Sequence, residues 1–180
     1  MRIYLTGFMT SGKSTIGPIL ANVMGLDFYD LDEQIEKKEN KKVVTIFEES
    51  GEQYFRELES TVLNEIASYD NVVIALGGGT IVNPVNFEMM KRSGKVIYLK
   101  VSPETLYNRL KHKTDRPIFK DLVLKEKNEK EFLARINELL ENRKSVYEKA
   151  DLIIDTEVTQ FGRTIDRIAK KITHLFHEKN

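Results

Sequence analysis

The residues with the most specific chemistry stand near the start of the chain, in the run GFMTSGKS at 7–14. This run fits the pattern GxxxxGK[ST], in which glycines, here Gly7 and Gly12, let backbone amides turn inward around phosphate oxygens. In that pattern Lys13 reaches the β- and γ-phosphates and the hydroxyl of Ser14 binds Mg²⁺. A helix that starts near Gly12 directs its positive end at the anion. The motif predicts a nucleotide phosphate site.

Two neighbouring residues are unusual for such a loop. Thr10 places a β-branched side chain in the middle of the loop, and Pro18 falls inside the helix that follows, where it removes a backbone donor and is expected to kink the helix. A plain glycine-rich turn between a strand and a helix is the alternative explanation of the motif.

Two aspartates follow the second apolar run, Leu26 to Tyr29. We expect Asp30 and Asp32 to lie along an extended strand end and to point in different directions. One carboxylate would then face Mg²⁺, and the other would accept the proton of a hydroxyl that attacks the γ-phosphate. The alternative is ordinary loop and capping chemistry.

Three arginines, Arg56, Arg116 and Arg143, do not belong to an obvious charged helical stripe. A guanidinium binds a carboxylate through two parallel hydrogen bonds, so two arginines would form a selective clamp for an acid. Glu59 is spaced one turn from Arg56 and can hold its guanidinium in place. Arg116 lies in an irregular segment suited to closing over the transferred phosphoryl group. A solvated surface charge is the alternative for each arginine.

A triple glycine, Gly77 to Gly79, directly follows the apolar run Val72 to Leu76. Glycines at a strand end let the backbone approach a ligand closely, so their amides could hold a hydroxyl or a phosphate oxygen. A flexible turn is the alternative.

Composition limits the class of protein. The chain has 180 residues, 41% of them apolar, with 28 basic and 28 acidic residues and no cysteine. We expect one globular domain without disulfides or thiolate metal sites, and a balanced charge gives no general attraction to nucleic acid or membranes. No long apolar run is present, so the sequence predicts a cytoplasmic protein that binds neither membranes nor nucleic acid.

Strand-like and helix-like segments alternate along the chain, which predicts an α/β fold with a parallel sheet and helices on both faces. Ligands bind at the carboxyl ends of the strands in such a sheet, so the phosphate loop, the aspartates and the triple glycine should meet at one edge. The expected strands are 3–5, 26–29, 72–76, 96–99 and 152–154. The expected helices include 12–23, 33–39, 43–51, 52–69, 129–149 and one that closes the chain; a mobile flap is expected near 111–130.

Together these residues resemble the shikimate kinase family of phosphate-loop kinases, which is similar to nucleoside monophosphate kinases. The matching blocks span nearly the whole chain: GFMTSGKST at 7–15, YDLDEQIE at 29–36, IFEESGEQYFRELE at 46–59, ALGGG at 75–79, DRP at 115–117 and ENRKSVYEKAD at 141–151. The resemblance implies a single three-layer P-loop kinase domain over 1–180 with a five-stranded parallel sheet. It also implies a substrate-binding segment at about 31–60, a mobile lid at about 111–127 and a monomer.

The resemblance implies transfer of the ATP γ-phosphate to the 3-hydroxyl of shikimate, with Mg²⁺ as cofactor. The residues implied for ATP are Thr10, Ser11, Gly12, Lys13, Ser14, Thr15, Arg109 and Arg116. Those implied for shikimate are Asp32, Arg56, Gly78, Gly79 and Arg143, with Phe47 and Phe55 beside its ring. Ser14 and Asp30 are implied for the metal, and Lys13, Asp32 and Arg116 for catalysis.

The chain departs from the family pattern at Thr10, where glycine is usual, at Pro18 and at RPIF in place of RPLL, and Thr156-Glu157 gives no clear adenine-contacting match. Two other functions remain to be weighed. A gluconate or nucleotide kinase would share the phosphate loop, and gluconate also carries a carboxylate. A regulatory nucleotide-binding module would lack a metal, base or lid group, whereas this chain has them all.

Overall fold

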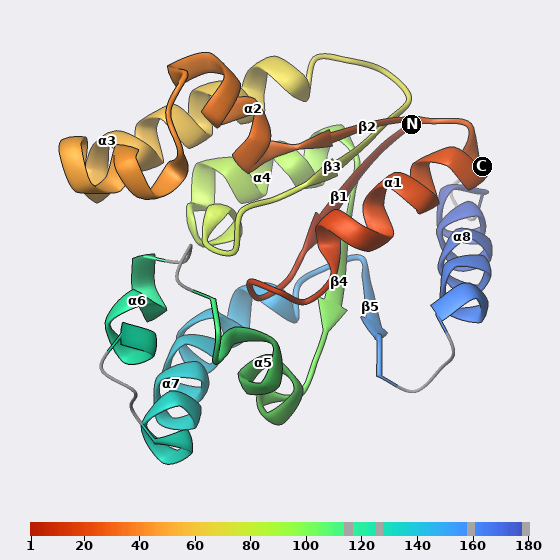
Figure 1. Cartoon of the computed structure of the whole chain (residues 1–180). Helices are drawn as coiled ribbons and strands as arrows, with labels where there is room; N and C mark the ends of the chain where they lie inside the picture. Colours follow the sequence, from red (N-terminus) through yellow and green to blue (C-terminus); the bar gives the residue numbers. More distant parts are fainter. Residues whose placement is uncertain (114–116, 125–127, 158–160, 178–180) are drawn as a thin grey trace.

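The fold is built on a sheet of five parallel strands in the order β2-β3-β1-β4-β5 (Figure 1). The computed structural model describes residues 1–113, 117–124, 128–157 and 161–177. The strands are β1 (Arg2–Thr6), β2 (Asp27–Asp30), β3 (Val72–Ala75), β4 (Lys95–Lys100) and β5 (Leu152–Asp155). The predicted α/β fold with an all-parallel sheet is confirmed.

Helices occupy most of the remaining described chain. They are α1 (Lys13–Met24), α2 (Leu31–Glu39), α3 (Val43–Ile66), the 3₁₀ helix η1 (Thr80–Val82), α4 (Pro84–Ser93), α5 (Pro103–Leu110), α6 (Pro117–Leu124), α7 (Glu129–Tyr147) and α8 (Phe161–His177). Within the described ranges, no helix combines the length and the apolar character that crossing a bilayer requires.

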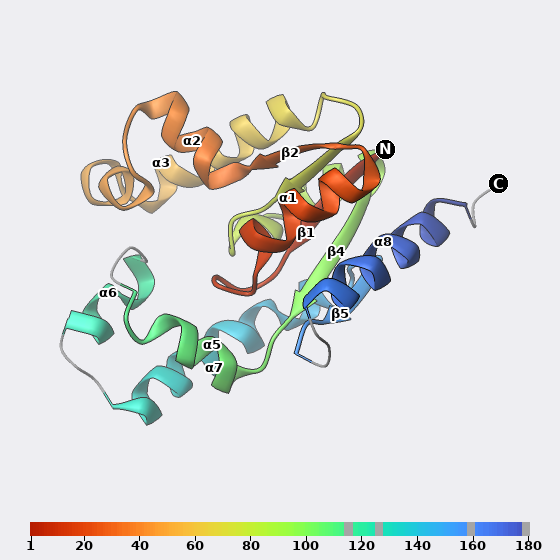
Figure 2. The same ribbon diagram turned by 45° about the vertical axis from the view of Figure 1, so that its right-hand side comes forward.

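Side chains of the central strand β1 alternate between two apolar cores, as a strand buried on both faces requires. Tyr4 packs into the core formed with α2, α3, α4 and the end of α7. Ile3 and Leu5 face the opposite side and pack into the core formed with α1 and α8. Figures 1 and 2 show this three-layer arrangement, with α8 beside α1 and the α2–α3 pair on the other face.

A third apolar cluster joins α5, α6 and α7 beside the phosphate loop. Its members include Phe8 of the loop, Phe119 of α6 and Phe132 of α7, all buried, and the rings of Phe8 and Phe119 meet edge to face with centroids 6.1 Å apart. The sequence predicts only an irregular flap in this region, so α6 is a difference. It begins at Pro117, a residue favoured at the first helical position, and the burial of Phe119 stabilises its packing.

Two helices contain residues that oppose helix formation. Gly51 has non-helical angles (φ 81°, ψ 172°) inside α3, so the predicted end of one helix at this glycine and the start of another are confirmed. Pro18 is exposed inside α1, which nevertheless continues from Lys13 to Met24.

The strand ends that carry the predicted site lie level with one another. Leu5 of β1 pairs with Ala75 of β3, and Ala75 pairs with Asp30 of β2. The segments that follow these residues are the phosphate loop, the triple glycine and the start of α2. Because the three strands are parallel and in register, these segments leave the sheet at one edge, as predicted.

Candidate active site

The phosphate loop connects β1 to α1 and has the backbone angles that the glycines suggest. Gly7 has φ 151° and Gly12 has φ 105°, and Ile16 N donates to Gly12 O at 2.8 Å to start the helix. Lys13 is only 8% exposed, and its Nζ donates to Gly7 O and Phe8 O, each at 2.9 Å. These bonds hold the ammonium group over the loop, where an anion would meet it.

Thr10 lies in the left-handed region with φ 61°, which is uncommon for a β-branched residue. Its carbonyl accepts a hydrogen bond from Nη1 of Arg109 at 2.9 Å, so α5 supports the loop at this strained position. The hydroxyls of Thr10 and Ser11 are buried and have no hydrogen-bond partner among the described residues. Because buried polar groups are normally paired, these hydroxyls fit a loop that receives a polar ligand.

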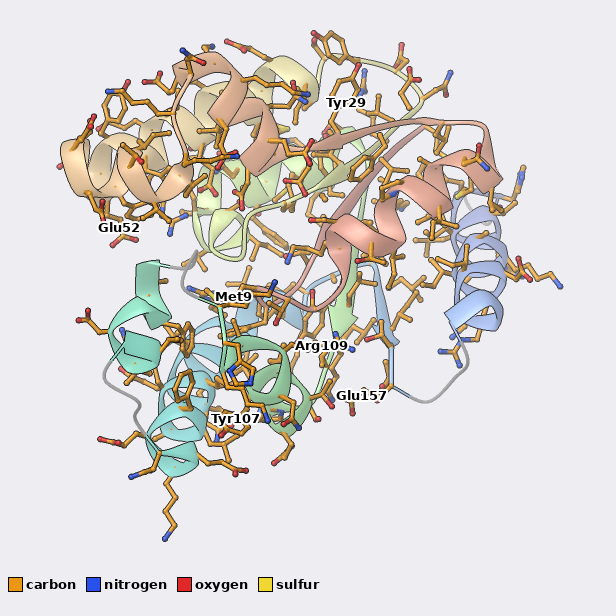
Figure 3. The ribbon with its side chains drawn as sticks, viewed as in Figure 1. Met9, Tyr29, Glu52, Tyr107, Arg109 and Glu157 are labelled. Atoms are coloured by element: carbon orange, nitrogen blue, oxygen red, sulfur yellow. The ribbon has the colours of Figure 1, made fainter. Side chains whose placement is uncertain are left out.

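Arg109 has an acidic neighbour beyond β5. Figure 3 shows Arg109 and Glu157 close together at the phosphate-loop end of the sheet. Glu157 accepts hydrogen bonds from the amide of Ser102 at 3.0 Å and from its hydroxyl at 2.8 Å. Hydrogen bonds from Thr105 and Ser102 lower the pKa of Glu157, and the charge of Arg109 lowers it further. Glu157 is therefore an anion near Arg109, one of the residues that the resemblance implies for ATP.

Asp30 is the last residue of β2 and is extended, as predicted, but Asp32 lies in the first turn of α2, so the prediction is wrong for Asp32. Helix α2 begins at Leu31, because Leu31 is fully buried and Asp30 caps the helix by accepting from Asp32 N at 3.0 Å. The expected geometry was also inconsistent, because residues two apart on an extended strand point to the same face and not in different directions. Instead Asp30 Oδ2 accepts from the Ser14 hydroxyl at 2.5 Å, while Asp32 lines the pocket described below.

Ser14 and Asp30 together fit a magnesium ion. A hydroxyl and a carboxylate in contact supply the hard oxygen ligands that Mg²⁺ prefers, and Mg²⁺ commonly uses one or two carboxylates besides phosphate oxygens and water.

Arg56 is held between two glutamates on α3. Its Nη1 donates to Glu59 Oε2 at 3.0 Å, and its Nε and Nη2 donate to Glu52 Oε1. Glu59 is 1% exposed and also accepts from the Thr80 hydroxyl at 2.6 Å. Burial opposes the charge of Arg56, but the carboxylates of Glu59 and Glu52 outweigh it and raise its pKa. The guanidinium is thus a fixed cation, as the spacing of Arg56 and Glu59 predicts.

The triple glycine passes between the two arginines of the predicted clamp. A Cβ atom at Gly79 would lie 2.9 Å from Nη2 of Arg56, so a side chain there would require the guanidinium to shift. On the other side, Nη1 of Arg143 donates to Gly78 O at 3.0 Å. A Cβ atom at Gly78 would lie 3.4 Å from Met9 N, so the glycine run also lies directly against the phosphate loop.

These segments enclose one pocket between α3 on one side and α6 and α7 on the other. In Figure 3, Met9 of the phosphate loop lies between these two groups of helices. The residues that line the pocket are Met9, Asp32, Val43, Phe47, Phe55, Arg56, Glu59, Gly77, Gly78, Gly79, Ile118 and Arg143. It combines two guanidinium groups, the carboxylate of Asp32 from the first turn of α2, and an aromatic wall in which the ring centroids of Phe47 and Phe55 are 4.5 Å apart.

The pocket brings together all the residues that the sequence assigns to the second substrate, although their roles remain predictions. Arg116 lies outside the described residues. Sequence reasoning missed Met9 and Ile118 as pocket residues, and it missed Tyr147, whose hydroxyl donates to Gly78 O at 3.0 Å. Tyr147 stands four residues after Arg143, a helical spacing that could have indicated a shared face.

The sheet order, the phosphate loop and the adjoining polar pocket define a phosphate-loop kinase. Residues 9–175 match the family model described as shikimate kinase. A curated shikimate kinase from Chlorobaculum parvum is 47% identical over 170 residues, covering 94% of this chain and 91% of the relative. The chain therefore belongs to the shikimate kinase family.

Solved structures agree with this assignment. Shikimate kinase from Bacteroides thetaiotaomicron superposes with a TM-score of 0.83 at 35% identity and covers 98% of each chain. Shikimate kinase from Acinetobacter baumannii, solved in complex with shikimate, superposes with a TM-score of 0.84 at 33% identity, covering 99% of this chain and 94% of that one.

Proposed function

We propose that this chain transfers the γ-phosphoryl group of ATP to the 3-hydroxyl of shikimate, producing shikimate 3-phosphate and ADP. The bond between the γ-phosphorus and the bridging oxygen of ADP breaks, and a new bond forms to the hydroxyl oxygen of the acceptor. The hydroxyl proton passes to the carboxylate of Asp32, which lines the acceptor pocket. Lys13, held over the phosphate loop, stabilises the charge on the β- and γ-phosphates.

The acceptor is held by its acid group and oriented by the glycine run. Arg56 and Arg143 lie on opposite sides of Gly78 and Gly79 and supply the two guanidinium groups of the carboxylate clamp. Phe47 and Phe55 face the apolar side of the ring. One chain supplies each of these residues, so a monomer is sufficient for the reaction.

Ser14 and Asp30 would hold Mg²⁺ beside the phosphate loop. When bound, Mg²⁺ neutralises charge on the β- and γ-phosphate oxygens.

The observation that carries this function is the contact between the acceptor pocket and the phosphate loop. Gly78 of the acceptor pocket lies against Met9 and Gly7 of the phosphate loop, at 3.4 Å from Met9 N and 3.9 Å from Gly7 O as measured from the Cβ position of Gly78. An acceptor in the pocket would therefore adjoin the terminal phosphate of a nucleotide on the loop, as direct transfer requires.

A coupled assay of ADP release tests the function. We expect ADP formation from ATP to require both shikimate and Mg²⁺, to stop when EDTA is added and to resume when excess Mg²⁺ is restored. Gluconate and nucleoside monophosphates serve as alternative acceptors in the same assay. Equal or greater stimulation by either of them, or no stimulation by shikimate, would contradict the proposal.

Replacing Arg56 with lysine tests the clamp. We expect the KM for shikimate to rise about 10- to 100-fold, because a point charge replaces a planar fork, with the KM for ATP nearly unchanged. Arg135→Lys is a matched control, since Arg135 pairs with Glu138 at the same three-residue spacing but lies outside the acceptor pocket. An equal rise of both KM values would mean that Arg56 supports the fold instead.

A further inference from the structure

We propose that Tyr147 is a positioning residue for the acceptor: its hydroxyl fixes the peptide between Gly78 and Gly79 from behind the pocket. This inference rests on the proposed function. Tyr147 does not line the acceptor pocket, whereas Gly78 and Gly79 do. It therefore acts on the acceptor indirectly, through the Gly78 carbonyl and through Arg143, which its hydroxyl also contacts.

The tyrosine ring is itself held firmly. Tyr147 is 1% exposed at the end of α7 and stacks on Tyr98 of β4, with ring centroids 4.5 Å apart and planes within 8°. Burial raises the pKa of Tyr147, so its hydroxyl keeps its proton and donates to Gly78 O at 3.0 Å. A hydroxyl on a fixed aromatic ring restrains the position of the Gly78 carbonyl oxygen more closely than a donor on a flexible side chain would.

Fixing this carbonyl also fixes the next amide. The peptide between Gly78 and Gly79 is trans, so the Gly78 carbonyl and the Gly79 N–H point in opposite directions across one plane. Tyr147 and Arg143 both hold the carbonyl from the α7 side, which turns the Gly79 N–H away from α7. Neither glycine has a side chain to restrain this peptide plane, and glycine backbone dihedral angles have a wide allowed range. The peptide is the central one of a turn in which Thr80 N donates to Gly77 O at 3.3 Å, and the bonds from Tyr147 and Arg143 hold its plane within that turn.

The two donors to Gly78 O, Arg143 and Tyr147, differ in their other interactions. Arg143 is also a member of the proposed carboxylate clamp, so its guanidinium must satisfy both Gly78 O and the acid. Tyr147 lies outside the acceptor pocket and does not bind the acid, although its hydroxyl also contacts the Arg143 guanidinium. Its stacked ring keeps the hydroxyl directed at Gly78 O. Loss of the tyrosine hydroxyl would make the orientation of the Gly79 amide depend on Arg143 alone, and acceptor binding would weaken.

Tyr147→Phe tests this role, because it removes one oxygen and keeps the stacked ring. We expect the KM for shikimate to rise about 3- to 10-fold while the KM for ATP stays within a factor of two. Tyr98→Phe is the matched control: it removes the hydroxyl of the other ring in the stack, and among the described side chains only those of Arg143 and Tyr147 donate to Gly78 O. We expect Tyr98→Phe to leave both KM values unchanged.

A measurement without substrate separates this inference from the proposed function. In ¹⁵N-labelled protein, Tyr147→Phe should shift the amide resonances of Gly78 and Gly79 and speed the exchange of the Gly79 amide, whereas Tyr98→Phe should not. If neither the amides nor the KM for shikimate respond, or if both KM values and the unfolding temperature change together, the positioning role is overturned. If the amides respond but wild-type protein shows no shikimate-dependent ADP release, the proposed function fails and the hold on the peptide stands.

Discussion

Replacing Asp32 with asparagine is expected to lower kcat by about 10²- to 10⁴-fold, the range that a general base contributes. Asparagine has nearly the shape of aspartate, but its amide cannot accept the proton of the attacking hydroxyl. Asp32 lies on the first turn of α2 and lines the acceptor pocket, with Oδ1 3.2 Å from the Cβ position of Gly77. The carboxylate is therefore next to the glycine run along which the acceptor would lie.

Steady-state kinetics with shikimate as the varied substrate measures this effect. Asp27→Asn is the matched control, because Asp27 is an exposed aspartate at the other end of the same strand β2, and it should leave kcat unchanged. If Asp32→Asn raised the KM for shikimate without lowering kcat, Asp32 would bind the acceptor and another group would take the proton.

Replacing Lys13 with methionine is expected to lower kcat by about 10²- to 10³-fold, the cost of losing one group that stabilises charge in the transition state. Methionine keeps most of the length of the apolar stem but removes the ammonium group. That group is nearly buried and is placed over the loop by two backbone carbonyls, and a neutral water molecule at this position would not supply its positive charge.

Binding and stability measurements separate the chemistry of Lys13 from its support of the loop. We expect calorimetric titration to show unchanged shikimate affinity for Lys13→Met, because the acceptor pocket does not contain this residue. Lys38→Met, which removes an exposed lysine paired with Glu65 on the surface, should leave kcat unchanged. If Lys13→Met abolished shikimate binding as well, the lysine would be required for folding of the site and not specifically for transfer.

Predictions from short-range patterns agree best with the structure. The glycine spacing predicts the positive φ angles of Gly7 and Gly12, and Gly51 does interrupt α3. The spacing of Arg56 and Glu59 predicts their ion pair. Each of these features depends on residues within about one helical turn, where allowed dihedral angles and side-chain directions are nearly independent of the rest of the fold.

Predictions that depend on packing were less successful. The sequence predicts that Asp32 lies on an extended strand end and that the helix starts at Glu33, but the full burial of Leu31 and the cap formed by Asp30 start α2 two residues earlier, at Leu31. Similarly, α6 occupies part of the expected flap, because Phe119 packs against Phe8 and Phe132 from distant segments. Apolar burial decided both cases, and it depends on partners that the local sequence does not contain.

By itself the sequence determined the class of this protein: the phosphate loop, the alternation of strands and helices and the arginine, aspartate and glycine blocks are all visible in its order of residues. Only the tertiary structure decided the strand order, the placement of Gly78 against the phosphate loop and the hydrogen bond from Tyr147 to a glycine 69 residues away. The physical reason is that backbone preferences act between near neighbours, whereas the contacts that complete the pocket follow from how the two apolar cores pack on the sheet.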